Sequence, residues 1–233
     1  MAAVQKGDVI LIEYAGYLAD NNELFDTNIE EVAKKHNKHD KEAKYHPMAI
    51  VVGERHVIKG LDDDFIGKEI GKEYTITIQP EDAFGKRDPS LIKTVSMSEF
   101  KKQNFTPQPG MILTFSSGAQ VKILSVSAGR VKLDYNHPLA GKVVRYTYRI
   151  VKKLDDPKDK LIGLAKTLAF LDLEGKVKKE GNTLIVDKSL ESLKDVLEKI
   201  VKDYIPNVKL EFADLSTKST KSNSKTKNVQ KSK

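Results

Sequence analysis

The sequence predicts an α+β fold in three units, and three features of its apolar pattern lead to this prediction. Strand-like alternation, interrupted by one short helical segment, fills the first 85 residues. A stretch of short strands and turns follows, and long alternation resumes near residue 143. Beyond residue 155, two amphipathic helical patterns flank a hairpin-like segment. Strand and helix patterns both recur along the chain, which is typical of an α+β protein.

The first unit opens with a strand from Ile10 to Leu18, and Asp20 to Asn22 supply a turn. The charged segment from Glu30 to Tyr45 predicts an exposed helical or irregular insertion, and Met48 to Val52 a short apolar strand. The apolar positions of the helix that follows are Leu61, Phe65 and Ile66. The strand after this helix alternates at Tyr74, Ile76 and Ile78.

The middle stretch from Arg87 to Asn136 differs from the first unit in composition, with three prolines and several glycine turns. Ser96 to Gln103 favour a brief helix within it. Its short strands are expected at Ile112 to Phe115, Val121 to Val126 and Arg130 to Tyr135. A longer strand from Val143 to Lys152 then returns to the first unit, and it alternates at Val144, Tyr146, Tyr148 and Ile150.

A third unit starts at Asp156 and Pro157, which predict a carboxylate N-cap with proline in the first helical turn. Gly175 to Val186 predict a hairpin, and Pro206 ends a second helix. The two apolar stripes are Leu161, Leu164, Leu168 and Leu171, then Leu190, Leu193, Leu197, Ile200, Val201 and Tyr204. A last strand alternates at Val208, Leu210 and Phe212.

Composition excludes several classes of function. The chain has no cysteine, which rules out disulfides, Cys-ligated zinc and thiol catalysis. The first nine residues lack the pattern of a signal peptide, and no apolar run approaches the roughly 20 residues of a membrane helix. We therefore expect a cytoplasmic protein without membrane contact.

The net charge of +7 is concentrated in two places. The stretch from Lys86 to Pro138 has eight basic and three acidic residues, and the tail from Ser216 to Lys233 has six lysines and no acid. The tail is too polar to pack and is expected to be disordered. Its lysines lack the arginine and aromatic neighbours that read bases, so only weak ribosome or RNA contact is expected.

Two patterns that evoke phosphate or metal chemistry fail on spacing. Gly67 to Glu73 has three residues between its glycines where a phosphate loop has four, and its Glu73 replaces the Ser or Thr that binds magnesium. Asp62 to Asp64 are consecutive and point around a helix, so they favour a solvated first turn over a metal site. Neither the Gly-x-Ser-x-Gly elbow nor the His-Glu-x-x-His motif occurs.

The histidines offer a metal alternative that we also set aside. His36 and His39 stand at helical spacing, with His46 nearby, and imidazoles in this arrangement can bind transition metals. In so charged a segment, exposed histidines are the simpler interpretation. We expect no metal and no cofactor.

Four short motifs in the first 85 residues resemble, in order and spacing, the FKBP prolyl isomerases. They are Ile12 to Leu18 (IEYAGYL), Phe25 to Thr27 (FDT), Gly53 to Leu61 (GERHVIKGL) and Asp82 to Gly85 (DAFG). Their order carries the resemblance, since each motif alone is weak. The resemblance implies a twisted antiparallel sheet wrapped on a short helix, and peptidyl-prolyl cis/trans isomerisation as the activity.

The segment from Asn136 to Gly141 (NHPLAG) is similar to the one through which FKBPs of the SlyD type rejoin the fold after a domain inserted in the flap. The implied isomerase domain is residues 1–85 and 137–153, with a mainly-β flap domain at 86–136. Residues 154–215 are similar to the extra α/β domain of long archaeal FKBPs, and 216–233 form the tail. The histidine-rich tail of bacterial SlyD proteins is missing, so metal storage is not implied.

By this resemblance, one apolar pocket holds the proline of the substrate. The backbone N–H of Ile58 is the family's donor to the carbonyl before proline, and Asp26 orients polar groups or meets the twisting carbonyl. The implied lining is Tyr14, Phe25, Asp26, Met48, Val57, Ile58, Leu61, Phe84, Leu139 and Tyr146. The alternative interpretation is that these side chains are only core.

Three lining positions depart from the best-known eukaryotic pattern. Leu61 replaces a tryptophan platform, Phe84 a tyrosine hydroxyl donor, and Met48 a phenylalanine. The pocket stays apolar but loses one hydrogen bond, worth about 0.5–1.5 kcal/mol. We therefore expect macrolide affinity to be weakened more than isomerase activity.

The middle stretch carries more apolar side chains than a domain of about 50 residues easily buries. We expect it to bind unfolded or nascent proline-containing chains and to deliver them to the pocket, although at least half of these residues must form its own core. The assigned residues are Ile92, Val95, Met97, Phe100, Phe105, Met111, Ile112 and Phe115.

Two further hypotheses stay open at this point. One is a binding-only chaperone, a holdase whose isomerase pocket has degenerated at Leu61 and Phe84. Retention of Phe25 and Asp26 favours the enzyme over this alternative. The other concerns assembly, because the thin core of the third unit predicts a homodimer formed through it.

Overall fold

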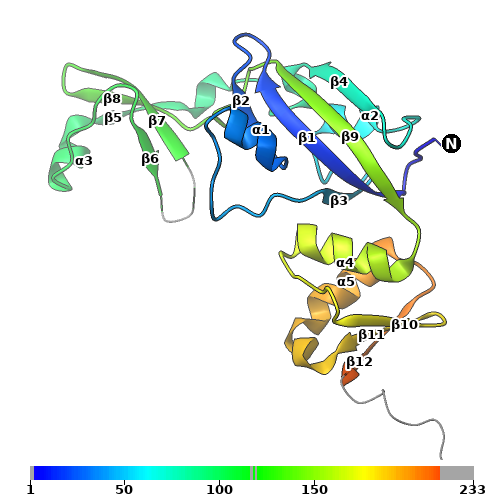
Figure 1. The fold of residues 1–233 in the computed structure, drawn as a ribbon. Helices are drawn as coiled ribbons and strands as arrows, with labels where there is room; N and C mark the ends of the chain where they lie inside the picture. The colour runs from blue at the N-terminus through cyan, green and yellow to red at the C-terminus, as the bar shows by residue number, and fades with distance from the viewer. Residues whose placement is uncertain (1–2, 116–117, 119, 216–233) are drawn as a thin grey trace, which may run out of the picture.

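The computed structural model describes residues 3–115, 118 and 120–215, which form three units along the chain (Figure 1). Each unit contains one sheet. The tail at 216–233, predicted to be disordered, lies outside the described residues. No helix within the described ranges has the length and apolar composition needed to cross a membrane.

The first unit is an antiparallel sheet with the strand order β2-β1-β9-β4, and β3 pairs with the first half of β1. Its strands are β1 (Val9–Leu18), β2 (Leu24–Thr27), β3 (Met48–Val51), β4 (Glu73–Ile78) and β9 (Val144–Leu154). The antiparallel sheet expected from the sequence is therefore confirmed. So is the alternation of the returning strand, whose buried residues include Val144, Tyr146, Tyr148 and Ile150.

One short helix, α2 (Lys59–Asp64), packs its Leu61 on the buried face of this sheet. Leu61 and Phe65 are buried as expected, but Ile66 is 49% exposed, so its assignment to the apolar face was wrong. The helix ends at Asp64, and beyond it the chain no longer follows the period that would turn Ile66 inward. In the charged insertion, only α1 (Glu30–Lys35) is helical.

The interpretation of Asp62 as a solvated acid was also wrong. Asp62 is fully buried, and its carboxylate accepts hydrogen bonds from the backbone N–H groups of Gly53 (2.9 Å) and Arg55 (3.0 Å). These two residues have positive φ angles of 91° and 59°, so the chain turns tightly before α2. The buried carboxylate thus holds the turn that leads to Val57 and Ile58.

The middle stretch forms an antiparallel sheet with the order β5-β8-β7-β6 and one helix, α3 (Met97–Lys102). Its strands are β5 (Ile92–Ser96), β6 (Ile112–Thr114), β7 (Gln120–Ser127) and β8 (Arg130–Asp134). The sequence did not predict β5, because its two apolar residues, Ile92 and Val95, do not alternate. The hydrophobic core of this unit consists of Val121, Ile123, Val131 and Leu133.

The two connections of the middle unit are clamped to each other. Short 3₁₀ turns at Pro80–Asp82 (η1) and Pro89–Leu91 (η2) lie on the incoming connection. The Asn136 side chain bonds the backbone of Asp88 in both directions, accepting from its N–H (2.8 Å) and donating to its carbonyl (2.9 Å). Arg87 pairs with the carboxylate of Asp134 beside these bonds. The middle unit is therefore held at one end and projects away from the first sheet (Figure 1).

The third unit places two helices, α4 (Pro157–Leu168) and α5 (Lys194–Tyr204), beside a three-stranded sheet. Its strands are β10 (Val177–Glu180), β11 (Thr183–Asp187) and β12 (Lys209–Ala213). The first two form an antiparallel hairpin, and β12 runs parallel to β11. Asp156 caps α4 as predicted, because its carboxylate accepts from the N–H of Lys158 (2.8 Å).

The two helical stripes of the third unit were only partly right. Leu161 and Leu164 are buried, but Leu168 is 37% exposed and Leu171 lies beyond α4, because the helix ends at Leu168. The second stripe begins on a 3₁₀ helix, η3 (Lys188–Leu193), and only its later residues lie on α5. All six residues of the second stripe nevertheless belong to or pack against one core cluster, so their assignment to the core is confirmed although the first part of the stripe is not α-helical.

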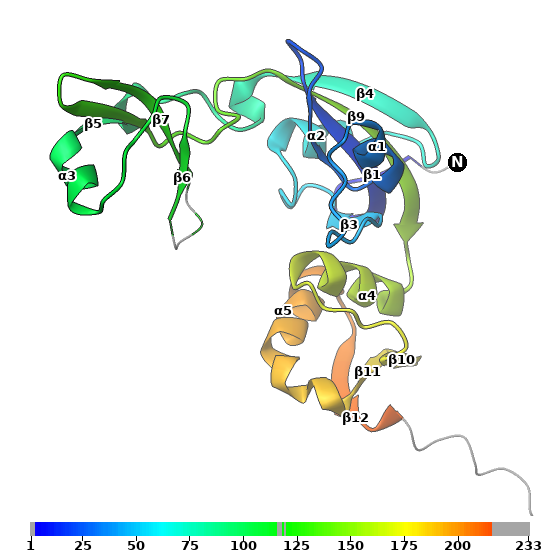
Figure 2. The same cartoon turned by 60° about the vertical axis from the view of Figure 1, so that its left-hand side comes forward.

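The third unit docks on the first through a shared core. Ala49 and Val51 of β3 belong to one apolar cluster with the buried leucines of α4, and Figure 2 shows α4 next to β3. The N–H of Ala49 donates to the hydroxyl of Thr167 (3.0 Å). A Cβ atom built on Gly163 would stand 3.0 Å from that of Ala49, so glycine allows this close approach without a shift of its neighbours.

A half-buried histidine adds a polar contact between the same two units. His56 Nδ1 accepts a hydrogen bond from the N–H of Val51 (3.2 Å), and its Nε2 lies 3.3 Å from the hydroxyl of Tyr204 on α5. Burial lowers the pKa of His56. The neutral ring fits this site, because protonation of Nδ1 would remove the acceptor that Val51 uses.

We expect Asp62→Asn to lower the free energy of unfolding by about 1.5–3 kcal/mol, since two backbone N–H groups lose a charged acceptor in a buried place. Asp63, the next residue, is exposed and forms a surface ion pair with Arg55. Asp63→Asn should therefore cost about 1 kcal/mol or less. Urea denaturation of both variants is the measurement, and equal losses would contradict the account.

The lowered pKa of His56 predicts a pH dependence. A base whose folded-state pKa is depressed binds fewer protons when folded, so its contribution to stability is complete above the unfolded value of about 6.5 and is lost as pH falls below it. Wild-type stability should therefore fall more steeply than that of His56→Gln below pH 6.5. Denaturation at several pH values checks this, with His39→Gln as the control. Parallel curves for wild type and His56→Gln would contradict it.

Candidate functional site

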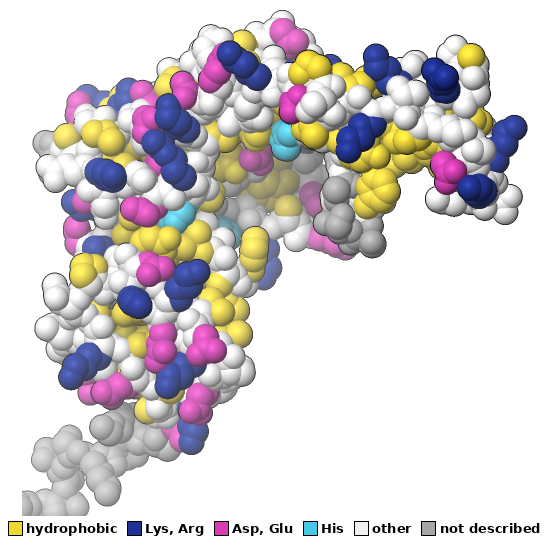
Figure 3. Space-filling view, turned by 180° about the vertical axis from the view of Figure 1, so that it is seen from behind, with side chains coloured by type: hydrophobic (Ala, Val, Ile, Leu, Met, Phe, Trp, Pro, Cys, Tyr) yellow, Lys and Arg dark blue, Asp and Glu magenta, His cyan; other side chains and the backbone are white. Residues whose placement is uncertain are grey.

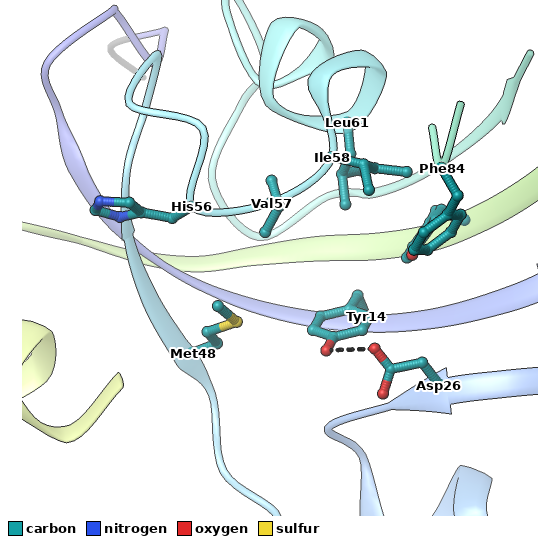
Figure 4. Close-up of a pocket in the computed structure, with 9 residues that line it drawn as sticks. Tyr14, Asp26, Met48, His56, Val57, Ile58, Leu61 and Phe84 are labelled. Carbon is teal, nitrogen blue, oxygen red and sulfur yellow. Dashed lines mark hydrogen bonds between the residues drawn. The ribbon is translucent and has the colours of Figure 1, made fainter. Parts of the chain in front are cut away.

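A hollow of about 370 Å³ opens where β1, β2, β3 and β9 approach the start of α2 (Figure 4). Eight of the ten residues implied by the sequence line it, together with one that the sequence interpretation missed. The lining is Tyr14, Asp26, Met48, His56, Val57, Ile58, Leu61, Phe84 and Tyr146. Apart from Asp26 and three ring-borne polar groups, these side chains are apolar.

The sheet register brings the polar end of the hollow together. Gly16 on β1 pairs with Asp26 on β2, and two residues earlier Tyr14 points to the same side. The Tyr14 hydroxyl donates a hydrogen bond to the Asp26 carboxylate (2.9 Å), as the dashed line in Figure 4 marks. Burial, together with the charge of Asp26, raises the pKa of Tyr14 well above its usual value, so this donor keeps its proton.

Aromatic rings form the back of the hollow. Phe25 meets Phe84 and Tyr146 edge-on, with ring centroids 5.8 and 5.7 Å apart, and it packs behind the lining instead of facing the space. Gly16 makes room for this cluster, because a Cβ atom there would stand 2.8 Å from the Phe25 ring. Leu139 likewise packs on the same core without lining the hollow.

The loop into α2 supplies the opposite wall. Val57 and Ile58 follow the turn that Asp62 holds, and Ile58 is the N-cap residue of α2, so its backbone N–H precedes the helical ladder. His56 comes just before them and also lines the hollow. The sequence interpretation missed His56, although its position inside the GERHVIKGL motif was a signal that could have found it.

The apolar residues assigned to chain binding in the middle unit divide into two groups. Val95, Met97, Phe100 and Phe105 pack against its small core. Met111, Ile112 and Phe115 are 36%, 56% and 47% exposed, and they lie on or beside β6. Ile92 is half-buried. Half of the eight residues thus serve the unit's own core, the minimum that the sequence interpretation required.

The three histidines considered for metal binding each have a different neighbour. His36 packs on Tyr17, His39 stacks on Tyr45, and His46 contacts the carbonyl of Pro47. No group of three or more metal-binding side chains occurs in the part of the chain that the structure describes. The hollow itself offers an apolar space with one carboxylate at its edge, an environment that suits binding without formation of a covalent bond.

Two family models match the chain. The model for the FKBP-type peptidyl-prolyl cis-trans isomerase matches residues 1–101, which include most of the hollow. The model described as FKBP26, IF domain matches residues 93–139, which cover the middle sheet. The second match places an insert-in-flap domain between β4 and β9.

Several curated proteins are similar to this chain. The short-type peptidyl-prolyl cis-trans isomerase of Methanocaldococcus jannaschii is 38% identical over 147 residues, which are 63% of this chain and 92% of the relative. The FKBP-type 16 kDa peptidyl-prolyl cis-trans isomerase of Escherichia coli K12 is 28% identical over 46% of this chain and 73% of its own. SlyD of Aeromonas hydrophila is 29% identical over 45% of this chain and 50% of its own length. The chain is an enzyme that belongs to the family of FKBP-type peptidyl-prolyl cis-trans isomerases and carries an insert-in-flap domain.

Proposed function

We propose that the 370 Å³ hollow binds the proline ring of a polypeptide and stabilises its X–Pro bond in mid-rotation. The observation that supports this most directly is the convergence of Tyr14, Ile58 and Tyr146, from three separate parts of the chain, around one apolar space. Phe25 and Leu139 act from behind by holding the lining in place.

The chemistry follows from the amide bond. Rotation about X–Pro meets a barrier of about 18–20 kcal/mol, because the planar amide is stabilised by resonance. The twisted amide loses that resonance and becomes less dipolar, so an apolar space favours it over the planar form. Stabilising the twisted form more than the planar one is catalysis, and it needs no covalent step.

The polar groups of the hollow have positioning roles in this proposal. The Ile58 N–H donates to the carbonyl of the residue before proline and fixes the chain at the mouth of the hollow. The Tyr14 hydroxyl and the Asp26 carboxylate hold each other at the opposite edge, near the carbonyl that turns. Because residue 84 is phenylalanine and not tyrosine, the site lacks one hydroxyl donor. This lack weakens the binding of macrolides more than it slows rotation of the X–Pro bond.

The first test is a peptide isomerisation assay on Asp26→Ala and Tyr14→Phe. Asp26→Ala should lower kcat/KM about tenfold, and Tyr14→Phe by less, because the ring remains and one hydrogen bond is lost. Phe84→Tyr should raise kcat/KM up to severalfold by restoring a donor. Glu31→Ala, which removes an exposed acid on α1, is the control. The role of Asp26 is refuted if its variant behaves like this control.

We further propose that the middle unit, residues 86–136, holds unfolded or nascent chains for the isomerase domain, residues 1–85 and 137–153. Its exposed Met111, Ile112 and Phe115 support this. Figure 3 shows apolar side chains on the underside of this unit, where they border the space between it and the rest of the molecule. A chain held there raises the local concentration of proline near the hollow.

This proposal predicts different effects on an unfolded protein and on a short peptide as substrates. Replacing Ile112 and Phe115 together by serine should slow a proline-limited protein refolding reaction severalfold, because the exposed apolar surface for the unfolded chain is lost. The rate on a short proline peptide should stay unchanged. Ile66→Ser is the matched control, since Ile66 is exposed to a similar degree outside this unit. Equal refolding rates for the double variant and wild type would remove the middle unit from the mechanism.

Other expectations from the sequence stay predictions. The third unit, residues 154–215, is expected to form a homodimer, and its exposed Leu168 and Val196 supply apolar surface for one. A cytoplasmic location and weak ribosome or RNA contact by the tail also stay predictions. The holdase alternative, an FKBP whose pocket has degenerated at Leu61 and Phe84, predicts uncatalysed rates in the peptide assay while aggregation is still suppressed.

A further inference from the structure

A second and larger hollow, about 910 Å³, adjoins the first. Its walls are the segment from Glu42 to Met48 on one side and the end of α4 on the other. Tyr14 and Met48 line both hollows, so the two spaces are neighbours on the surface of the protein. A chain bound at the isomerase hollow is therefore close enough to reach this second space.

Phe170 lines the second hollow from the third unit and is an unusual residue for its place. It is 92% exposed, and its φ of 56° lies in the left-handed region that favours glycine or asparagine after a helix. The helix end is satisfied by the backbone alone, because the N–H of Leu171 returns to the carbonyl of Ala165 (3.1 Å). Neither burial nor helix capping explains this phenylalanine, whereas contact with a bound molecule does.

Both walls of the second hollow are fixed before anything binds. On one side, the Asn28 amide accepts from the N–H of Tyr14 (2.8 Å) and donates to the carbonyls of Ile12 (2.9 Å) and His46 (3.2 Å). On the other, α4 is docked on β3 through Thr167 and the close approach of Gly163. Phe170 is thus held at a set position relative to Met48.

The charge of the walls indicates which kind of molecule fits. Lys44 and Lys166 are balanced by Glu42 and Asp172, so the hollow has no single sign. A nucleic acid or another polyanion would meet two carboxylates there. An extended polypeptide, neutral along its backbone and carrying apolar side chains, would not be repelled by these carboxylates.

We propose that the second hollow is a substrate subsite of the isomerase, in which an apolar side chain of the bound polypeptide, some residues away from its proline, packs on Phe170. The inference rests on the proposed role of the first hollow. It assigns the third unit a part in substrate selection: peptides with a suitably placed apolar residue bind more tightly than short proline peptides.

The test compares three peptides on wild type, Phe170→Ala and Phe170→Asn. One is a proline tetrapeptide, and the other two are decapeptides that carry leucines either before or after the proline. Equilibrium binding by fluorescence anisotropy and isomerisation kcat/KM are both measured. Phe170→Ala and Phe170→Asn should weaken the binding of one decapeptide, and lower its kcat/KM, about five- to tenfold, because leucine loses its apolar partner. The tetrapeptide should be unaffected.

Ile66→Ala is the control, since it removes an exposed apolar side chain outside both hollows. Phe170→Asn suits the left-handed backbone, so an unchanged or raised melting temperature separates loss of binding from loss of structure. Equal binding of both decapeptides by wild type and the Phe170 variants overturns the proposal. It is also overturned if these variants change only the oligomeric state, which would assign Phe170 to contact with a second copy. If wild type itself does not accelerate isomerisation of the tetrapeptide, the proposed role of the first hollow is refuted instead.

Discussion

The antiparallel pairing of β1 with β9 is the constraint on which the rest of the structure depends. The two strands pair from Val9 with Leu154 to Leu18 with Val144. The first and the last strand of the first unit therefore lie side by side, although the middle unit is inserted between them in the sequence. This register puts Gly16 opposite Tyr146, which brings the aromatic cluster and the Tyr14 hydroxyl to one side of the sheet. Without it, the lining would have no common surface.

The insertion is compatible with this pairing because its two connections are held together. Asn136 and Asp88 exchange two hydrogen bonds, and the neighbouring Arg87 and Asp134 form an ion pair. The middle sheet therefore adds length between β4 and β9 without pulling them apart. The same clamp fixes the place at which the middle unit leaves the isomerase sheet.

Much of the fold and most of the hollow could be predicted because the informative residues lie in ordered local patterns. The alternation of β9 and the FKBP-like motifs place their side chains on one face of a sheet, and period two leaves little freedom. The errors share a different cause. Asp62 is buried because distant backbone N–H groups at Gly53 and Arg55 satisfy it, and an acid at a helix start gives no hint of such partners.

The exposure of Ile66, Leu168 and Phe170 shows a second limit. All three were ordinary apolar residues in the sequence, and their surroundings depend on where a short helix ends to within one or two residues. The second hollow could not be predicted at all, because it lies between the segment leading into β3 and the end of α4, and no local sequence pattern indicates how the third unit docks. His56 illustrates the intermediate case, since it stood inside a recognised motif but its contact with Tyr204 required the docked unit.

The central claim is that the hollow beside Met48 receives the prolyl group, and methionine methyl NMR tests it directly. The chain has four methionines, of which Met48 lines the hollow while Met97 and Met111 lie on the middle unit. During titration with a proline tetrapeptide, the Met48 signal should shift and saturate while the signals of Met97 and Met111 stay in place. A shift of Met111 alone, with Met48 unmoved, would contradict the account.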